Sequence, residues 1–249
     1  MSSRPMIQLT FFELKLFFRN YINVFFLLFF PTMMILLFGG IYGNEPREIY
    51  NGYGMVDVSV PAYAGMIISV TGLMNLPLTL CEYREKKILK RFKATPISPE
   101  KVIIAQLGIC LVMTTFGMIF LLIVAKLIYS LQTPGNIGGI FGVFFLSMLS
   151  IFSVGFLIAA IAPNMKAASA IANFVYFPML FLTGATIPYE VLPKIMQKIA
   201  IFLPVTHVVK AMQGIWLNYD FTEYRMNLIV LVIIAVIAYI VSLRIFRWE

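Results

Sequence analysis

The sequence predicts an all-α membrane protein that crosses the lipid bilayer six times. Hydrophobic residues make up 61% of the 249 residues, whereas charged residues make up only 12%. Soluble domains are usually nearer to half apolar and a quarter charged. The apolar residues form six long runs, and a membrane-spanning helix needs about 20 of them in succession. The chain is basic, with a net charge of +8, and its basic residues gather at the ends of these runs.

The first 20 residues mix basic with aromatic side chains ahead of the first apolar run. Gln8, Lys15 and Arg19 fall on one face of a helix, so residues 1–20 are predicted to form a loosely amphipathic helix lying at the membrane surface. A simple cytoplasmic extension of the first span is the alternative. The first apolar run is longer than that of a signal peptide and lacks an A-x-A-like site, so no cleavage is expected.

The six spans follow in order along a single transmembrane domain that covers residues 1–249. We expect them at about residues 21–42, 60–80, 102–125, 138–162, 167–183 and 227–245. With the N-terminus on the cytoplasmic side, thirteen of the 19 Lys and Arg residues fall on that side. Because short cytoplasmic loops are rich in Lys and Arg, both termini are predicted to be cytoplasmic. We find no second domain and no internal repeat.

Several kinds of chemistry are missing from the sequence. No acid or base is expected in the middle of a span, which argues against a carrier driven by ion flux. The chain has no GxxxxGK[ST] phosphate-binding loop and no GxSxG nucleophile motif. His207 is the only histidine, and Cys81 and Cys110 lack metal-ligand spacing. We therefore expect no catalytic site, no metal site and no cofactor. The absence of a basic stripe with interleaved aromatics also disfavours nucleic acid as a partner.

The most charged stretch of the chain, residues 82–101, lies between spans 2 and 3. Ile88, Leu89 and Phe92 form an apolar stripe among basic residues, which predicts a helix. Thr95-Pro96 should end that helix, and Ser98 can cap the next one. The segment is predicted to be a rigid charged elbow on the cytoplasmic face. A simple anchor to anionic lipids would explain the charge. It would not explain the acidic residues or the rigid Thr-Pro-x-Ser-Pro turn.

A semi-polar region, residues 184–226, separates spans 5 and 6 on the outer side. Gly184, Pro188, Pro193 and Pro204 interrupt the helix there, and His207 follows. We expect short helices that dip back into the outer leaflet as a re-entrant plug or gate, since irregular backbone at that depth must be buried or line a cavity. An ordinary outer loop with short helices is the alternative.

At these two segments the sequence resembles the membrane subunit of type 2 ATP-binding-cassette exporters. The match in the elbow consists of Glu82, Arg84, Glu85, Leu89, Arg91, Thr95, Pro96 and Ser98. Lys86 and Lys87 stand where that family often has glycine. The match on the outer side consists of Thr183-Gly184, Pro188, Leu192-Pro193 and Pro204-Val205-Thr206. The resemblance extends over essentially the whole chain.

The resemblance implies a membrane subunit that pairs with a second permease, either an identical chain or a close homologue. It also implies two separate ATPase subunits that bind ATP and Mg²⁺ and dock on the cytoplasmic face of a bacterial inner or cell membrane. The eight matched elbow residues would form the coupling contact with these ATPases. Gly184, Pro188, Pro193, Pro204 and His207 would belong to the outer gate.

An apolar or amphiphilic solute, such as a drug, an antibiotic or a lipid, fits the 23 Phe and 15 Met residues of the chain. Export of a polysaccharide or another polar polymer is the alternative within the family, and it would need hydrogen-bonding groups along the path. The candidates are Thr114, Thr115, Ser147, Ser150, Ser153 and Asn173. An ATP-independent channel or a membrane scaffold is the alternative from another class. The substrate-contacting residues are not identifiable from the sequence.

Overall fold

A computed structural model describes residues 14–15, 17–19, 21–48, 52–88, 99–132, 136–183 and 192–246. Every regular element within these ranges is helical, which confirms the all-α prediction. Six helical segments of the described chain are long and apolar enough to cross a membrane, as predicted: Tyr21–Tyr42, Met55–Glu85, Val102–Tyr129, Ile137–Ile161, Met165–Leu182 and Phe221–Ile245. The amphipathic helix predicted over residues 1–20 falls almost wholly outside the described residues.

The first two spans each consist of three consecutive helical elements. Span 1 is α2 (Tyr21–Val24), η1 (Phe25–Phe29) and α3 (Phe30–Tyr42), and span 2 is α4 (Met55–Ser69), η3 (Val70–Asn75) and α5 (Leu76–Glu85). The remaining spans are α7 (Pro99–Tyr129), α8 (Ile137–Ile161), α9 (Met165–Leu182) and α12 (Phe221–Ile245). Two shorter helices, α10 (Lys194–Ala200) and α11 (Pro204–Trp216), lie between α9 and α12.

A proline follows each of the two π-helical segments, η1 and η3. Pro31 comes two residues after η1 ends, and Pro77 comes two residues after η3 ends. Proline lacks an N–H and its ring crowds the carbonyl of the preceding turn. A wider turn ahead of the proline relieves that conflict, so the helix continues across the membrane instead of breaking.

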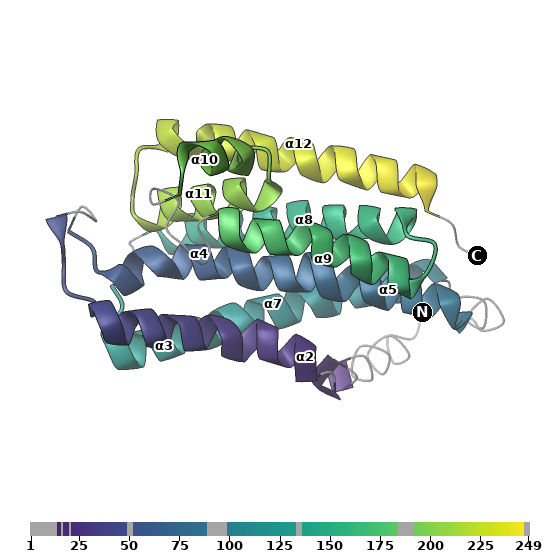
Figure 1. Ribbon diagram of the computed structural model, residues 1–249, viewed down its shortest axis with the longest axis horizontal. Helices are drawn as coiled ribbons and strands as arrows, with labels where there is room; N and C mark the ends of the chain where they lie inside the picture. The colour runs from purple at the N-terminus through teal and green to yellow at the C-terminus, as the bar shows by residue number, and fades with distance from the viewer. Residues whose placement is uncertain are drawn as a thin grey trace.

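The six spans run side by side along the long axis of the molecule, with α4 and α5 through the middle (Figure 1). Span 1 and α7 lie on one side of span 2, and α8, α9 and α12 lie on the other. One end of the bundle, called the α5 end below, holds the start of α2, the end of α5, the α8–α9 turn and the end of α12. The opposite end, called the α11 end, holds α10, α11 and the connection from α3 to α4.

Glycine allows α8 to approach span 2 closely. A Cβ added at Gly155 would lie 1.8 Å from the carbonyl oxygen of Gly72 in η3. Conversely, a Cβ at Gly72 would lie 2.7 Å from the ring of Phe152. Small residues at such crossings allow helix backbones to touch where lipid supplies no hydrophobic drive for association. Span 2 is accordingly the most buried span of the bundle.

Span 2 is longer than predicted at both ends, and this changes the position of Asp57. The helix starts at Met55 rather than near residue 60, so Asp57 belongs to its first turn instead of the preceding loop. The side chain is fully buried, and its carboxylate accepts hydrogen bonds from the backbone N–H groups of Gly54 and Gln132, both at 3.0 Å. The carboxylate also accepts from the Asn44 amide at 3.2 Å. Asp57 thus ties the start of span 2 to the α7–α8 junction.

Candidate functional site

α5 runs past the predicted end of span 2, to Glu85, and a turn follows it. The backbone N–H of Lys86 bonds the carbonyl of Glu82 at 2.9 Å, and that of Lys87 bonds the carbonyl of Arg84 at 3.0 Å. Lys87 has a positive φ of 54°, a left-handed conformation that commonly ends helices. A turn therefore separates α5 from the predicted apolar stripe. Five of the predicted coupling residues lie outside the described chain: Leu89, Arg91, Thr95, Pro96 and Ser98.

Arg84 turns back into its own bundle. Its guanidinium donates to the carbonyl oxygen of Ala159 at 3.3 Å and to that of Ala162. These carbonyls belong to the last turn and the C-cap of α8, where helix geometry leaves acceptors without an intrahelical donor. The positive charge also suits the negative pole of the α8 dipole. Arg84 therefore holds the end of α8 against α5.

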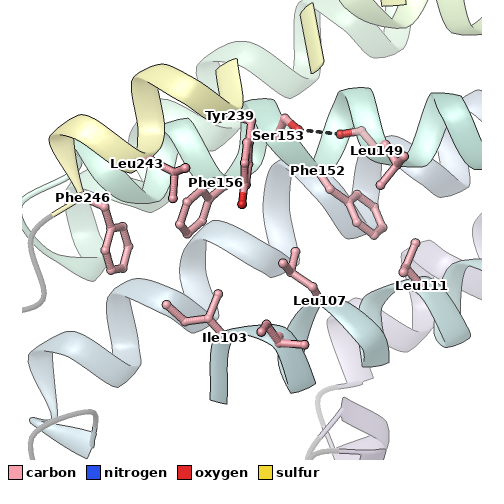
Figure 2. Close-up of a pocket in the computed structure, with 11 residues that line it drawn as sticks. Ile103, Leu107, Leu111, Leu149, Phe152, Ser153, Phe156, Tyr239, Leu243 and Phe246 are labelled. Atoms are coloured by element: carbon pink, nitrogen blue, oxygen red, sulfur yellow. Dashed lines mark hydrogen bonds between the residues drawn. The ribbon is translucent and has the colours of Figure 1, made fainter. Parts of the chain in front are cut away.

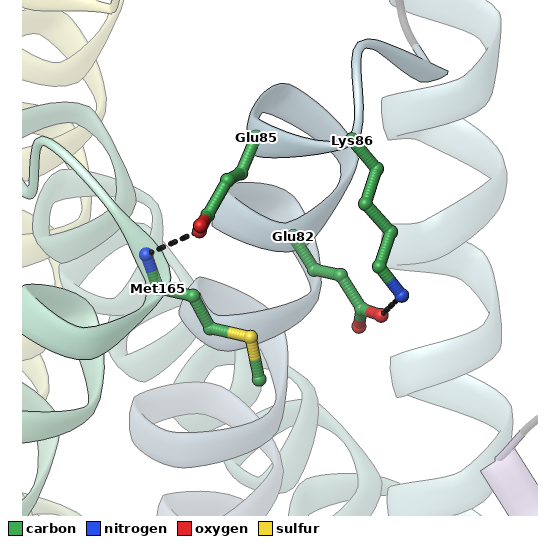
Figure 3. Close-up of polar contacts among 4 residues, drawn as sticks. All are labelled: Glu82, Glu85, Lys86 and Met165. Atoms are coloured by element: carbon green, nitrogen blue, oxygen red, sulfur yellow. Dashed lines mark hydrogen bonds and ion pairs between the residues drawn. The ribbon is translucent and has the colours of Figure 1, made fainter.

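Glu85 makes the complementary contact with the next helix (Figure 3). Its carboxylate accepts a hydrogen bond from the backbone N–H of Met165 at 3.1 Å, at the start of α9. A negative charge is favourable at the positive N-terminal pole of a helix. Arg84 and Glu85 thus secure opposite helix poles on either side of the turn 162–164. We call this pair of contacts the α5 clamp.

Glu82 and Lys86 form an ion pair on the outside of the same helix end (Figure 3). Their hydrogen bond raises the pKa of Lys86 above its ordinary value of 10.5, so Lys86 stays charged near neutral pH. Lys86 and Lys87 are exposed, whereas Arg84 is half-buried. Arg84, and neither lysine, was predicted from the sequence as a coupling residue. In the structure, Lys86 and Lys87 are the positive charges that a docking partner could reach.

The predicted outer gate contains a sharply bent helix pair at the α11 end. α10 and α11 meet at 94°, with Pro204 in the first turn of α11 and Pro193 just ahead of α10. The short helices predicted between spans 5 and 6 are therefore present. Gly184 and Pro188 lie outside the described residues.

His207 connects the bent pair to span 6. Its Nε2 lies 2.9 Å from the carbonyl oxygen of Ile201, and its Nδ1 lies 2.9 Å from the side-chain oxygen of Asn227 on α12. Because a carbonyl only accepts hydrogen bonds, Nε2 carries a proton. The residue therefore braces the α10–α11 bend against α12.

The two helices of the bend differ in burial. α11 buries one face among α4, α8 and α12, with Val208 and Met212 fully enclosed. In contrast, α10 and the turn after it leave large apolar side chains exposed, including Ile195 and Phe202. α11 is therefore a fixed part of the core, and α10 presents an apolar surface beside it.

Two apolar grooves lie between α7 and α8. One is a cavity of about 430 Å³, where Ile103, Leu107 and Leu111 of α7 face side chains of α8 and α12 (Figure 2). The other is a cavity of about 310 Å³ nearer the α11 end, lined by α7, α8 and α11 and bordered by Lys126. Both grooves lack a row of hydrogen-bonding groups, so they fit apolar chains rather than polar ones.

Four of the six side chains considered for a polar path bond within their own helix. Thr114, Thr115 and Ser153 donate to the carbonyl four residues earlier, at 2.7, 2.8 and 2.7 Å. Asn173 donates to the hydroxyl of Ser169 at 3.3 Å. Ser147 and Ser150 are fully buried, and their hydroxyl oxygens have no hydrogen-bond partner. Hydrogen bonds therefore do not join these six residues into one polar wall.

Cys81 and Cys110 are buried and are not joined in a disulfide. Among the described residues, no group of three or more His, Cys, Asp or Glu side chains could hold a metal ion.

Comparison with known proteins identifies the family. A family model described as ABC-2 type transporter matches residues 6–217. Nodulation protein J of Rhizobium leguminosarum bv. viciae is 32% identical over 99 residues, which are 40% of this chain and 38% of the relative. The inner membrane transport permease YhhJ of Escherichia coli K12 is 25% identical over 162 residues, 62% of this chain and 43% of the relative.

A third relative, the putative transport permease ycf38 of Porphyra purpurea, is 25% identical over 201 residues, 78% of this chain and 68% of the relative. The chain spans about two fifths of the length of the first two relatives. The family model, however, covers most of this chain. The protein therefore belongs to the ABC-2 type transporter family, as a multi-pass membrane permease.

Proposed function

We propose that this chain is the membrane subunit of an ATP-driven exporter. In this proposal, residues 1–249 act as one permease domain and pair with a second permease, identical or homologous. Two separate ATPase subunits bind ATP and Mg²⁺ and dock at the α5 end, which faces the cytoplasm of a bacterial cell together with both termini. Membership of the ABC-2 family supports association with an ABC ATPase.

The α5 clamp is the observation that carries the proposal. It joins the end of α5 to the α8–α9 turn through Arg84 and Glu85. Span 2 then runs as one helical series, the most buried of the bundle, to Asp57 at the other end. A force applied to the α5 end would therefore move span 2, α8 and α9 together. Such a rigid connection is what a lever driven by an external ATPase requires.

The distribution of charge supports an external energy source. Within the six described spans, acids and bases occur only among the first or last five residues, as with Asp57, Lys126 and Arg225. A proton- or ion-driven carrier normally places an ionisable residue in the middle of a span.

The apolar grooves favour an amphiphilic solute, such as a lipid or an apolar drug. Both cavities between α7 and α8 are lined mainly by aliphatic and aromatic side chains. A polar polymer or a channel would need hydroxyl and amide groups along a shared wall, whereas the intramembrane threonines bond to their own helices.

Co-purification of an ATPase with this chain from its native membrane, in mild detergent, tests the proposal. We expect the double reversal of Lys86→Glu with Lys87→Glu to release the ATPase. A matched reversal at the opposite end, Lys194→Glu with Lys198→Glu, should retain it. Inverted membrane vesicles should then accumulate a fluorescent amphiphile only when ATP is supplied. The proposal fails if the wild-type protein retains no P-loop ATPase, or if uptake proceeds equally without ATP.

A further inference from the structure

A third cavity differs from the apolar grooves in its chemistry. It measures about 630 Å³ and lies where α2, α5 and α7 meet near the α5 end. Amides, a hydroxyl, aromatic rings and charged groups line it: Phe17, Arg19, Tyr21, Asn23, Asn75, Thr79, Glu82, Tyr83, Lys86 and Gln106, beside Ile22, Ile88 and Ile109. A mixed polar cavity of this size next to membrane-spanning helices is a candidate binding site.

Two amides in its wall are buried with one polar atom each lacking a hydrogen-bond partner. Asn75 is 6% exposed and Gln106 is 4% exposed. The side-chain oxygen of Asn75 accepts from Asn23 at 2.8 Å, while its Nδ2 has no partner. The Nε2 of Gln106 lies 3.9 Å from the Cys110 sulfur, and its Oε1 has no partner. An unpaired buried polar group destabilises the folded state, so such groups in folded proteins call for an explanation.

The two unpaired atoms require a ligand that can both accept and donate hydrogen bonds. Asn75 has an unused N–H donor, and Gln106 has an unused carbonyl acceptor. A hydroxylated group can satisfy both, because each of its hydroxyls accepts one hydrogen bond and donates another. An ionised phosphate or carboxylate only accepts hydrogen bonds, so it would leave the side-chain oxygen of Gln106 without a donor. Phe17 and Tyr21 add aromatic surface to the same cavity, which suits the apolar faces of a sugar or polyol ring.

An exposed apolar row leads away from the cavity along span 1. Ile22 lines the cavity and is 67% exposed, and Phe25, Phe29 and Met33 follow at intervals of three or four residues. Residues at this spacing lie on one side of a helix. A molecule with its polar head in the cavity could therefore lay an apolar tail along this row.

We infer that the cavity binds the hydroxylated head group, such as a sugar or polyol, of an amphiphile whose tail lies along span 1. This inference deepens the proposed function, since it names the head-group chemistry of the amphiphilic solute. The same chemistry occurs in an exported glycosylated solute and in a membrane lipid with a polyol head.

Thermal unfolding in lauryldimethylamine oxide, a detergent without hydroxyl groups, tests the site. Two probes with the same tail, dodecyl glucoside and dodecylphosphocholine, are added at equal mole fraction. We expect the glucoside to raise the midpoint of wild type by about 3 °C or more, because a ligand bound only by the folded state stabilises it. The phosphocholine should raise it by less than a third as much.

Gln106→Met separates binding from folding. The substitution removes an unpaired buried acceptor, so the variant should unfold at the same or a higher temperature without probe, yet lose most of the glucoside shift. Gln132→Met, the same change at an exposed site at the other end, should keep the full shift. Equal shifts with both probes, or a full shift in Gln106→Met, would overturn the inference.

The same probe distinguishes the two sources of the head group. In vesicles supplied with ATP, dodecyl glucoside should inhibit amphiphile uptake if the site belongs to the exported solute. It should leave uptake unchanged or stimulate it if the site holds a membrane lipid. Both results agree with a binding site in this cavity and differ only in which molecule occupies it. The unfolding assay contains neither ATP nor ATPase. The binding site and the exporter proposal can therefore fail independently. An intact glucoside shift without ATP-dependent uptake contradicts only the exporter proposal, and ATP-dependent uptake without the shift contradicts only the site.

Discussion

Replacing Arg84 by methionine should loosen the α5 end of the bundle. Methionine keeps the apolar stem but removes the guanidinium. The carbonyl oxygen of Ala162 would then lose the Arg84 donor, and that of Ala159 would keep only the weak Cys81 thiol, at 3.7 Å. The α8–α9 turn would be held to α5 mainly by Glu85.

The geometry sets the size of the effect. A hydrogen bond to a charged group contributes about 1.5–3 kcal/mol, which gives roughly 3–6 kcal/mol for two. Arg84 is only half-buried, so water can reach part of this helix end and replace some of the loss. We expect a loss of about 2–3 kcal/mol, or roughly 4–12 °C in the unfolding midpoint for a chain of this size. Lys86→Met breaks only an exposed ion pair, so it should leave the unfolding midpoint almost unchanged.

Thermal unfolding of Arg84→Met, Lys86→Met and wild type in one detergent measures the difference. A double-mutant cycle with Glu85→Gln should show coupling, because both clamp residues hold the turn 162–164. The clamp is refuted if Arg84→Met unfolds within about 1 °C of Lys86→Met. If Arg84→Met keeps full stability and yet releases the ATPase, Arg84 is a docking residue instead.

Three further changes test other contacts. Gly155→Ala would place a methyl group against the Gly72 carbonyl, so unfolding should show a loss of about 3 kcal/mol or more; wild-type stability would disprove the close crossing. Asp57→Asn replaces an acceptor with a donor, and faster hydrogen exchange of the Gln132 amide should report the broken contact, whereas unchanged exchange would contradict it. His207→Phe removes two contacts, so α10 should exchange faster and stability should fall by about 1–2 kcal/mol; unaltered protection would exclude the brace.

Much of the fold was predictable because lipid imposes simple rules. A span must be about 20 residues long and must satisfy its backbone internally, so six apolar runs predict six helices. The interruption of the helix between spans 5 and 6 was also predictable, because proline disrupts a helix interior and Pro193 and Pro204 lie in this segment. The turn after Glu85 was not predicted, because Lys86-Lys87 contains no glycine or proline to reveal it.

The charged cluster illustrates what was and was not predictable within the site. Its sequence indicated a cytoplasmic charged elbow, but not which charges face outward. The inward turn of Arg84 and Glu85 depends on the α8–α9 turn, which lies some 80 residues away along the chain. A pattern within one segment carries no information about such a distant partner.

Hydropathy and helix-breaking residues act locally, so the class of protein, the number of spans and the two polar segments between them could be predicted from the sequence. The shared polar cavity of Asn75 and Gln106 is a property of the tertiary structure. Each residue alone reads as an isolated amide in an apolar helix. The packing of three spans brings them together, and burial is what gives their unpaired atoms an energetic cost.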